Sequence, residues 1–521
     1  MKKMPLFLSV VFASAVLLAE DGTMAQSGNW GKGSTWGGTV PAFGAGSTLT
    51  TLPDAAATLS LLTNDVTVGH IATTASGVNA DAAFTMASMS YGRKYADAVT
   101  PNNSVDGDWS WGGLDGRLVF DNGAEPATVE VGATASDKFA YRHVYNVPVV
   151  LKSDLSIRNA YAGTASASEK LPTQPTTVVF GQKITDDGAK KGITVANDSK
   201  VSAVNFAADN DFTGDVNVQG GFIRAVRHLG WGKEGTPFGH DNTVRAAGGA
   251  VDLAGLKTPA SQTLEIGGGF TTGLGTFGAL FSSCQDPDIT AVWQGPVTLT
   301  ADATFGGTHS GLQGWRAWTA QGFGGDLEVS GGISGAFAAH ITGVNTVTFS
   351  GSNSFSGGLY LDSCVSGLVT DPSFFKATSD ASFGTGGVVF NGGVYLVDAD
   401  SADISKQTIS CEGTSAARLF VSEGVTYEPE NGLAGYSLAK EGPGALCLSK
   451  ASTLNSGGVF TLNGGELILD SKDNLTVQAL LGKVPTVSGK TRITVRDSVG
   501  GHSSLSQEIR GFVHKCGCVG G

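Results

Sequence analysis

Short runs of alternating hydrophobic and polar residues recur along almost the whole chain. Residues 66–68, 216–218 and 493–495 each place apolar side chains at every second position, which directs them to one face of a β-strand. Glycine, asparagine, aspartate and serine separate these runs, as tight turns require. Helical periodicity is almost absent, and only residues 153–160 and 504–510 are ambiguous. The pattern predicts an all-β protein of many short strands.

The strand runs also follow a repeated order. Residues 210–223, 353–361 and 454–469 each enter through a polar residue and a glycine corner into an alternating strand. A second unit, at residues 229–253 and 383–396, joins a Gly-x-Gly to a strand, a Gly-Gly corner and another strand. Glycine reaches positive φ at little steric cost, so such corners let the chain coil. Stacked coils bury an apolar column that one coil alone cannot bury.

We therefore expect a right-handed parallel β-helix, that is, a β-solenoid, with irregular loops and roughly 20–25 residues per turn. The segments with the pattern Asn-x-Phe-x-Gly resemble the autotransporter-associated β-strand repeat of bacterial surface and secreted proteins. Residues 438–446 (LAKEGPGAL) are similar to the Leu-x-Lys-x-Gly-x-Gly-x-Leu stretch that precedes this repeat in the family. The best matches cover residues 200–254, 341–397 and 436–470, and weaker echoes cover most of 57–490.

The resemblance implies a passenger-type solenoid and says little about activity. Autotransporters end in an outer-membrane barrel built from strands of about 10 residues. Residues 509–521 leave no room for such a barrel, so we expect a passenger-type protein without a C-terminal autotransporter barrel. A passenger whose barrel is a separate chain, or has been lost, is the related alternative.

The N-terminus has the order of a secretory signal peptide. A basic start (MKK) precedes an apolar run over residues 6–19, and a small-x-small sequence ends at Ala25, as cleaved leaders require. The run is shorter than the roughly 20 residues that span a bilayer, and we expect no transmembrane segment in the mature chain. The expected organisation is a signal peptide at 1–25, an N-terminal cap with Trp30 and Trp36 and the first rungs at 26–115, a β-solenoid at 116–490, and a C-terminal tail at 491–521.

Composition narrows the class of partner. The chain has 76 glycines in 521 residues and only 15% charged residues, yet 41% are hydrophobic, which is too many for a disordered chain. Its formal net charge is −13, and nucleic-acid binding relies on basic side chains, so we expect no nucleic-acid partner. Six cysteines are too few for a disulfide scaffold in a chain of this length.

Known catalytic and cofactor motifs are incomplete. A G-x-G-x-x-G sequence at 230–235 leads into a turn instead of the helix that a nucleotide site needs. Residues 398–403 alternate aspartates but lack the glycine and glutamate of a calcium loop. No nucleophile elbow, zinc-protease helix or Cys–His pair appears. We therefore expect no catalytic residue, cofactor or metal.

Two tryptophan-rich stretches are the candidate ligand-facing patch, because exposed aromatic rings stack on sugars. Burial inside a wide rung is the favoured alternative, since tryptophan is highly buried on average. The candidate residues are Trp109, Trp111, His309, Trp315, Arg316 and Trp318.

These features together predict an exported protein, secreted or at the cell surface, with a structural or adhesive role and no chemistry of its own. Surface glycans or host extracellular matrix are the expected partners. The alternative is a carbohydrate-active β-helix enzyme, either a polysaccharide lyase or a glycoside hydrolase. Hydrolysis would require two carboxyl groups roughly 5–10 Å apart on one face.

Overall fold

The computed structural model places strands along most of the chain that it describes. The described residues are 20–23, 28–29, 37–39, 41–51, 57–60, 66–68, 70–73, 83–87, 117–131, 142–159, 177–198, 200, 202–225, 233–272, 275–284, 288–309, 325–343, 345–363, 373–433, 437–452, 458–470, 486–497 and 502–510.

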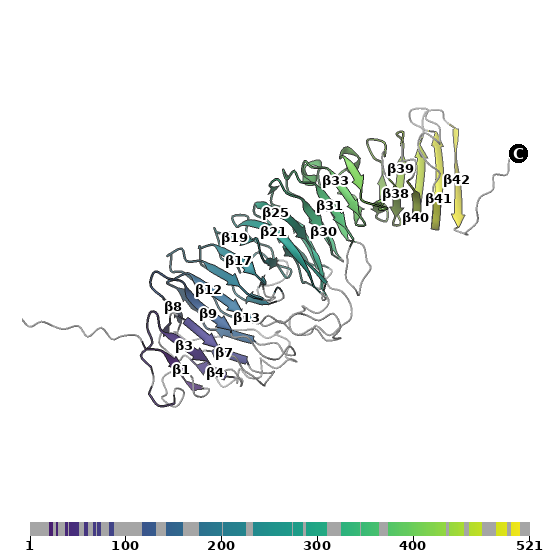
Figure 1. The fold of residues 1–521 in the computed structure, drawn as a ribbon. Helices are drawn as coiled ribbons and strands as arrows, with labels where there is room; N and C mark the ends of the chain where they lie inside the picture. Colours follow the sequence, from purple (N-terminus) through teal and green to yellow (C-terminus); the bar gives the residue numbers. More distant parts are fainter. Residues whose placement is uncertain are drawn as a thin grey trace, which may run out of the picture.

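The chain coils as a parallel β-solenoid, as expected, and successive turns stack into an elongated, curved rod (Figure 1). Strands of neighbouring turns pair side by side in three parallel ladders, which form the walls of the rod. The first ladder contains β1 (Gly22–Thr23), β3 (Thr48–Thr51), β6 (His70–Thr73), β9 (Ala127–Val131), β12 (Leu155–Asn159), β15 (Ile193–Ala196), β17 (Val216–Gly220), β19 (Thr243–Ala246), β21 (Thr263–Thr272), β25 (Val297–Phe305) and β28 (Ile333–Ser334).

The second ladder runs beside the first and shares the end of β25 with it. It contains β2 (Gly28–Asn29), β4 (Ala57–Ser60), β7 (Ala83–Ala87), β10 (Arg142–Asn146), β13 (Thr177–Phe180), β16 (Ala203–Phe206), β18 (Phe222–Ala225), β20 (Ala250–Asp252), β23 (Leu280–Phe281), β29 (Ala339–Ile341), β31 (Leu359–Asp362), β33 (Val388–Asn391) and β35 (Ile409–Cys411).

The third ladder starts as a four-stranded sheet, continues through isolated bridges at Asp211 and Lys257, and ends as a longer sheet. It contains β5 (Val66–Val68), β8 (Leu118–Phe120), β11 (Val149–Leu151), β14 (Ile184–Thr185), β24 (Thr290–Trp293), β27 (Asp326–Val329), β30 (Thr346–Phe349), β32 (Phe374–Ala377), β34 (Val394–Val397), β36 (Ala417–Val421), β38 (Leu438–Glu441), β40 (Phe460–Asp470) and β41 (Thr486–Asp497). The strand β39 (Ala445–Leu448) pairs with the second half of β40, and β37 (Thr426–Tyr427) pairs with β39.

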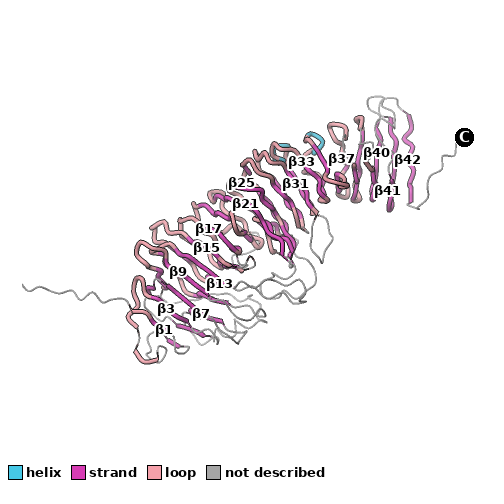
Figure 2. Tube along the Cα trace, viewed as in Figure 1, coloured by secondary structure: helices cyan, strands magenta, loops and turns pink. Residues whose placement is uncertain are grey.

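Few described elements lie outside the ladders. Two single-turn 3₁₀ helices, η4 (Asp380–Phe383) and η5 (Ile404–Lys406), occupy corners (Figure 2). The strands β22 (Gly275–Gly278) and β26 (Gly307–His309) form a small antiparallel extension, and β42 (His502–Arg510) ends the described chain. In the described part of the chain, no helix is long and apolar enough to cross a membrane.

Turn length varies more than the sequence suggested. Partners in neighbouring turns are 20 residues apart between Ala339 and Leu359, and 59 residues apart between Ala83 and Arg142. The pairing needs only a short strand on each wall, so additional residues are accommodated between strands without changing the stack.

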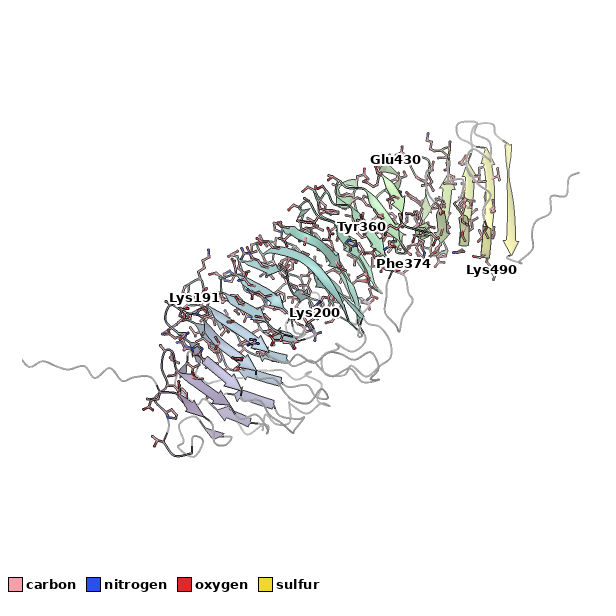
Figure 3. All side chains as sticks on the ribbon, in the orientation of Figure 1. Lys191, Lys200, Tyr360, Phe374, Glu430 and Lys490 are labelled. Carbon is pink, nitrogen blue, oxygen red and sulfur yellow. The ribbon has the colours of Figure 1, made fainter. Side chains whose placement is uncertain are left out.

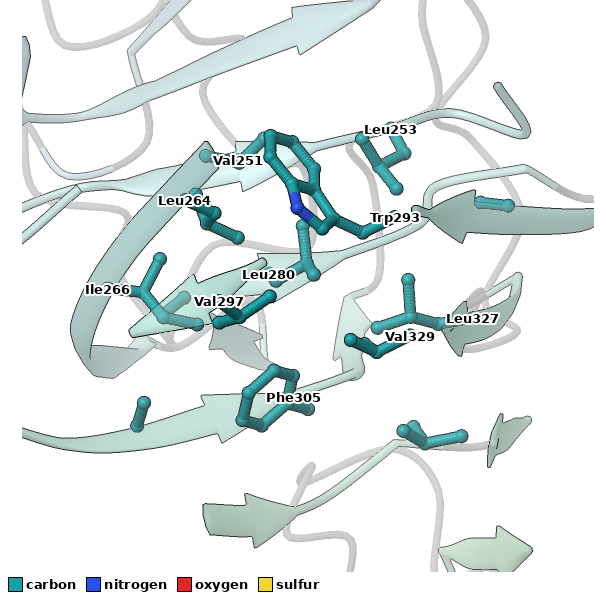
Figure 4. Close-up of a cluster of buried hydrophobic side chains, with 14 of the residues drawn as sticks. Val251, Leu253, Leu264, Ile266, Leu280, Trp293, Val297, Phe305, Leu327 and Val329 are labelled. Atoms are coloured by element: carbon teal, nitrogen blue, oxygen red, sulfur yellow. The ribbon is translucent and has the colours of Figure 1, made fainter. Parts of the chain in front are cut away.

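The core fills the space enclosed by the three ladders. Every second residue of a strand points inward, and side chains from all three walls meet there, as around the fully buried Trp293 (Figure 4). Aromatic rings also stack from turn to turn, with centroids 5.2 Å apart between Tyr145 and Phe180 and 5.9 Å apart between Phe180 and Phe206. Burying each such side chain contributes roughly 1.5–3 kcal/mol, so the column as a whole stabilises the rod.

The Asn-x-Phe motif found in the sequence joins three successive turns. The side-chain oxygen of Asn353 accepts a hydrogen bond from the Ile333 amide at 2.8 Å, and its nitrogen donates to the Ser382 carbonyl at 2.6 Å. Asn210 makes the equivalent pair of bonds with the Ile184 amide and the Pro237 carbonyl. A corner that lacks a strand thus still satisfies the backbone groups of the turns on either side.

The phenylalanine of the same motif explains one glycine of the second repeat unit. Gly239 and Gly384 have φ of 82° and 76°, and a Cβ on either would lie 2.8 Å from a ring carbon of Phe212 or Phe355. The shared Gly-x-Gly of this unit predicts that residues 229–232 and 383–386 occupy equivalent positions. In the structure, residues 238–239 are instead equivalent to residues 383–384. Each pair stacks on the buried phenylalanine of an Asn-x-Phe motif in the preceding turn, which is Phe212 or Phe355.

Replacing Asn353 with alanine should destabilise the solenoid by about 2–4 kcal/mol, because the Ile333 amide and the Ser382 carbonyl lose their partner inside the protein. Urea denaturation followed by circular dichroism measures this loss. Ser354→Ala, at the exposed neighbouring position, is the control. Equal stability of the two variants would contradict the bridging role.

Both ends of the described chain extend further than the expected boundaries. Residues 20–23 fall in the expected signal peptide but contain β1. The expected tail from residue 491 instead continues β41, which pairs in parallel with β40, and then reverses into β42. The two ambiguous segments are strands, β12 and β42, because neighbouring turns supply the pairing. Trp30 and Trp36 of the expected cap lie outside the described residues.

Candidate functional site

Five of the six residues of the predicted tryptophan-rich patch lie outside the part of the chain that the structure describes. Trp109, Trp111, Trp315, Arg316 and Trp318 lie outside the described residues. His309 ends β26, where its backbone pairs with Gly275 of β22. The patch therefore stays a prediction from the sequence.

Charged side chains on the outer walls are joined between neighbouring turns. Among the residues that the structure describes, in three places a cation lies between two carboxylates of the turns on either side, within 3.4 Å of both. We call these sets ion triplets; they are Glu130–Arg158–Asp198, Asp215–Arg245–Glu265 and Asp380–Lys406–Glu430. Exposed pairs of this kind add little stability each, but they join the outer walls of neighbouring turns.

Arg224 and Asp252 form a buried ion pair between neighbouring turns. The Arg224 Nε donates to Asp252 Oδ2 at 2.6 Å, and the two side chains are 10% and 0% exposed. The other oxygen of Asp252 accepts from the amides of Ala254 and Ser283. This carboxylate is saturated by its neighbours, and a fully engaged buried pair fixes adjacent strands.

The strongest candidate site is a cluster on the outer face of the second ladder, around β29, β31 and β33. His340 and Tyr360 are register partners on β29 and β31, and their rings stack with centroids 4.6 Å apart. Tyr360 lies on the surface of the rod near its middle (Figure 3). The stacking leaves both rings partly exposed, so a polar ligand can reach them.

Asp362 fixes the orientation of the imidazole. His340 Nδ1 lies 2.8 Å from Asp362 Oδ2, and the side-chain amide of Asn391 donates to the other carboxylate oxygen at 2.9 Å. Three consecutive turns thus contribute to the cluster: β29 provides His340, β31 provides Tyr360 and Asp362, and β33 provides Asn391. The remaining polar atoms, His340 Nε2 and the Tyr360 hydroxyl, have no hydrogen-bond partner among the residues that the structure describes.

The surroundings favour the charged imidazole. The hydrogen bond with Asp362 raises the pKa of His340 against the opposing effect of burial, and the nearby charges of Asp302 and Glu412 act in the same direction. His340 therefore carries a proton on Nε2 over a wider pH range than a free histidine, and it presents a hydrogen-bond donor to the solvent.

The cluster presents hydrogen-bonding groups to the solvent. A histidine oriented by a carboxylate provides two of the three members of a hydrolytic triad, and a nucleophilic hydroxyl or thiol must complete it. Within the described ranges no such group is hydrogen-bonded to His340. Nor do the described residues contain a group of three side chains that could hold a metal ion. The cluster offers one cationic donor, one phenol and one amide, the groups that recognise hydroxyls and carboxylates of a ligand.

Replacing Asp362 with asparagine should lower the pKa of His340, because the imidazolium loses its anionic partner. In the native protein the raised pKa adds stability below the unfolded value, near 6.5, and this contribution disappears as pH rises through the folded pKa. Histidine C–H resonances followed by NMR over pH 5–9 measure the shift, with Asp400→Asn as the control. An unchanged His340 titration would refute the pairing.

The sequence contained these residues but gave no signal that joined them. His340 and Asp362 are 22 residues apart, and their contact depends on the 20-residue offset between β29 and β31. Other turns have different offsets, so one sequence cannot fix which positions meet. No family model, no curated protein and no solved structure matches this chain, and its function is argued from the fold and this cluster.

Proposed function

We propose that the chain is an exported protein, secreted or at the cell surface, with a structural or adhesive role. The observation that carries the proposal is the outer surface of the rod. Its ion triplets join charged groups of neighbouring turns. The partly exposed His340 cluster presents hydrogen-bond donors to the solvent, and among the described residues no nucleophilic hydroxyl or thiol is hydrogen-bonded to His340. The resemblance of residues 353–361 and 438–446 to passenger repeats supports the same role.

The binding partner follows from the chemistry of the cluster. Stacked rings with adjacent hydrogen-bonding groups suit sugar units, so surface glycans or glycosylated matrix proteins are the proposed ligands. Because the rod repeats its walls along one axis, it can hold such a site well away from either end (Figure 1).

Localisation is the first test. Fractionation of the native cells, with protease accessibility of intact cells, should find the protein outside the cytoplasm. Recovery only in the cytoplasm would overturn the proposal.

Ligand binding is the second test. The purified protein should bind a subset of an immobilised glycan and matrix panel, and Tyr360→Ala should abolish this binding. Phe420→Ala is the matched control, because Phe420 is a partly exposed aromatic residue on the third ladder. Equal loss in both variants would contradict the assigned site, and new reducing or unsaturated ends on the glycans would show an enzyme instead.

A further inference from the structure

The charges around the His340 cluster restrict the kind of glycan that it can bind. An imidazolium N–H can donate to a hydroxyl or to a carboxylate of a ligand. One carboxylate is already present, because Asp362 Oδ2 lies 2.8 Å from His340 Nδ1. The charges on the neighbouring turns therefore determine whether a second carboxylate, carried by a ligand, is accepted beside this pair.

Asp302 provides a carboxylate on the turn that precedes β29. Asp302 and Thr304 flank the buried Ala303 of β25. Thr304 is the register partner of His340. Asp302 thus lies diagonally across from His340, roughly 8 Å away between Cα atoms, from a strand spacing of about 4.8 Å and a rise of about 3.3 Å per residue. Its Oδ1 accepts a hydrogen bond from the Ala338 amide at 2.9 Å, which holds the carboxylate beside β29.

Glu412 provides a further carboxylate on the other side of the cluster. It directly follows β35, and its amide donates to the Phe390 carbonyl of β33 at 2.9 Å. Phe390 immediately precedes Asn391, which is the register partner of Asp362. Asp362, Asn391 and Glu412 therefore follow one another on successive turns, about 4.8 Å apart. Asp302 and Glu412 are both exposed, and they border the two rings from opposite directions along the rod.

The charges of these groups do not cancel. Three carboxylates outweigh one imidazolium, so the formal charge of the cluster is −2 when His340 is protonated and −3 when it is neutral. Arg418 also reaches this part of the wall, where its Nη1 donates to the Gly392 carbonyl at 3.0 Å. Its guanidinium is already neutralised by Glu441, whose two carboxylate oxygens accept from Nε and Nη2. The excess of negative charge thus remains in both protonation states of His340.

We propose that the His340 cluster binds glycans without acidic groups, and that Asp302 and Glu412 exclude carboxylated and sulfated ones. This inference rests on the glycan binding proposed above. Like charges brought together at a binding site weaken binding and suppress wrong partners. The Debye length at physiological ionic strength is about 8 Å, so salt reduces this repulsion without removing it. Sugar hydroxyls meet no such penalty and still reach the Tyr360 hydroxyl and the His340 ring.

Matched pairs of immobilised glycans, each a neutral glycan and its sialylated or sulfated counterpart, test the assignment on the purified full chain. At physiological salt we expect binding to the neutral members only. The double variant Asp302→Asn, Glu412→Gln should gain about tenfold in affinity for the acidic members, keep its affinity for the neutral ones, and lose the gain at high salt. The control variant Asp400→Asn, Glu423→Gln removes two exposed carboxylates that follow β34 and β36 of the third ladder, and its selectivity should not change.

Two results would overturn the selection by charge while leaving glycan binding intact. One is native protein that binds acidic members as tightly as neutral ones. The other is a gain for acidic members that is absent in the Asp302 and Glu412 variant or equal in both double variants, since an equal gain would follow from the net charge of the whole chain. Asparagine at position 302 keeps an acceptor for the Ala338 amide, so an unchanged unfolding midpoint verifies the fold. Failure to bind any glycan overturns the proposed ligand and this inference together.

Discussion

Alanine at Gly331 should destabilise the middle of the rod by about 3 kcal/mol, the upper end of what forced overpacking usually costs. An ideal Cβ on Gly331 would lie 1.8 Å from the Gly295 carbonyl oxygen of the preceding turn. Gly295 itself approaches the Gln262 carbonyl, and Gly351 approaches the Gly331 carbonyl. These glycines form a column at one corner, where backbone atoms of successive turns touch and cannot rotate away.

Thermal or urea unfolding of Gly331→Ala measures the effect, and hydrogen exchange should show faster opening of the turns on either side. Gly38→Ala is the matched control, because a Cβ on Gly38 meets no atom within 4 Å. If both variants have the same unfolding midpoint as the native protein, the close approach of backbone atoms at this corner is not the reason for the glycine.

Methionine at Lys440 should produce a comparable or larger loss, about 3–5 kcal/mol, near the C-terminal end. The Lys440 ammonium is fully buried and donates to the carbonyls of Gly442, Gly444 and Gly464 at 2.6, 2.5 and 2.9 Å. Burial lowers the pKa of Lys440 to about 8, so the amine keeps its third proton at neutral pH. Methionine fills similar space but removes the ammonium from the Gly442 and Gly464 carbonyls, and it leaves the Gly444 carbonyl with the Glu466 amide alone.

Urea denaturation of Lys440→Met, with hydrogen exchange over β38 to β41, measures this effect. Lys490→Met is the control, because Lys490 is exposed on the neighbouring strand β41. Arginine is a further informative replacement, since it keeps the charge but has a larger head group than the Lys440 ammonium, which lies against Gly465. Native stability of Lys440→Met would show that the three carbonyls do not depend on this ammonium.

The class of fold could be predicted from the sequence because its causes are local. Alternating residues and corner glycines act within a few positions, and they repeat often enough to be seen. The two motifs also marked real positions: the lysine and both glycines of residues 438–446 form the Lys440 corner, and the asparagine of residues 353–361 bridges three turns.

The remainder could not be predicted because it depends on which turns become neighbours. The Gly-x-Gly pattern predicts that residues 229–232 and 383–386 are equivalent. The structural equivalent of Gly384 is instead Gly239, and only its contact with Phe212 reveals this. The His340 cluster joins three strands with successive offsets of 20 and 29 residues, and no fixed spacing in the sequence gives these two values in succession. The hydrophobic pattern does not predict that β42 runs antiparallel to β41, because polar and apolar residues alternate in the same way in parallel and antiparallel strands.

That reversal also determines how the coil stops. A parallel coil ends in an edge on which the first strand of another molecule could stack and continue the winding, much as subunits add to a fibril. Because β42 runs antiparallel to β41, the last described edge of the third ladder points the wrong way for a strand of a second copy to continue this ladder in parallel. Continued parallel winding from this edge into a second copy is therefore disfavoured.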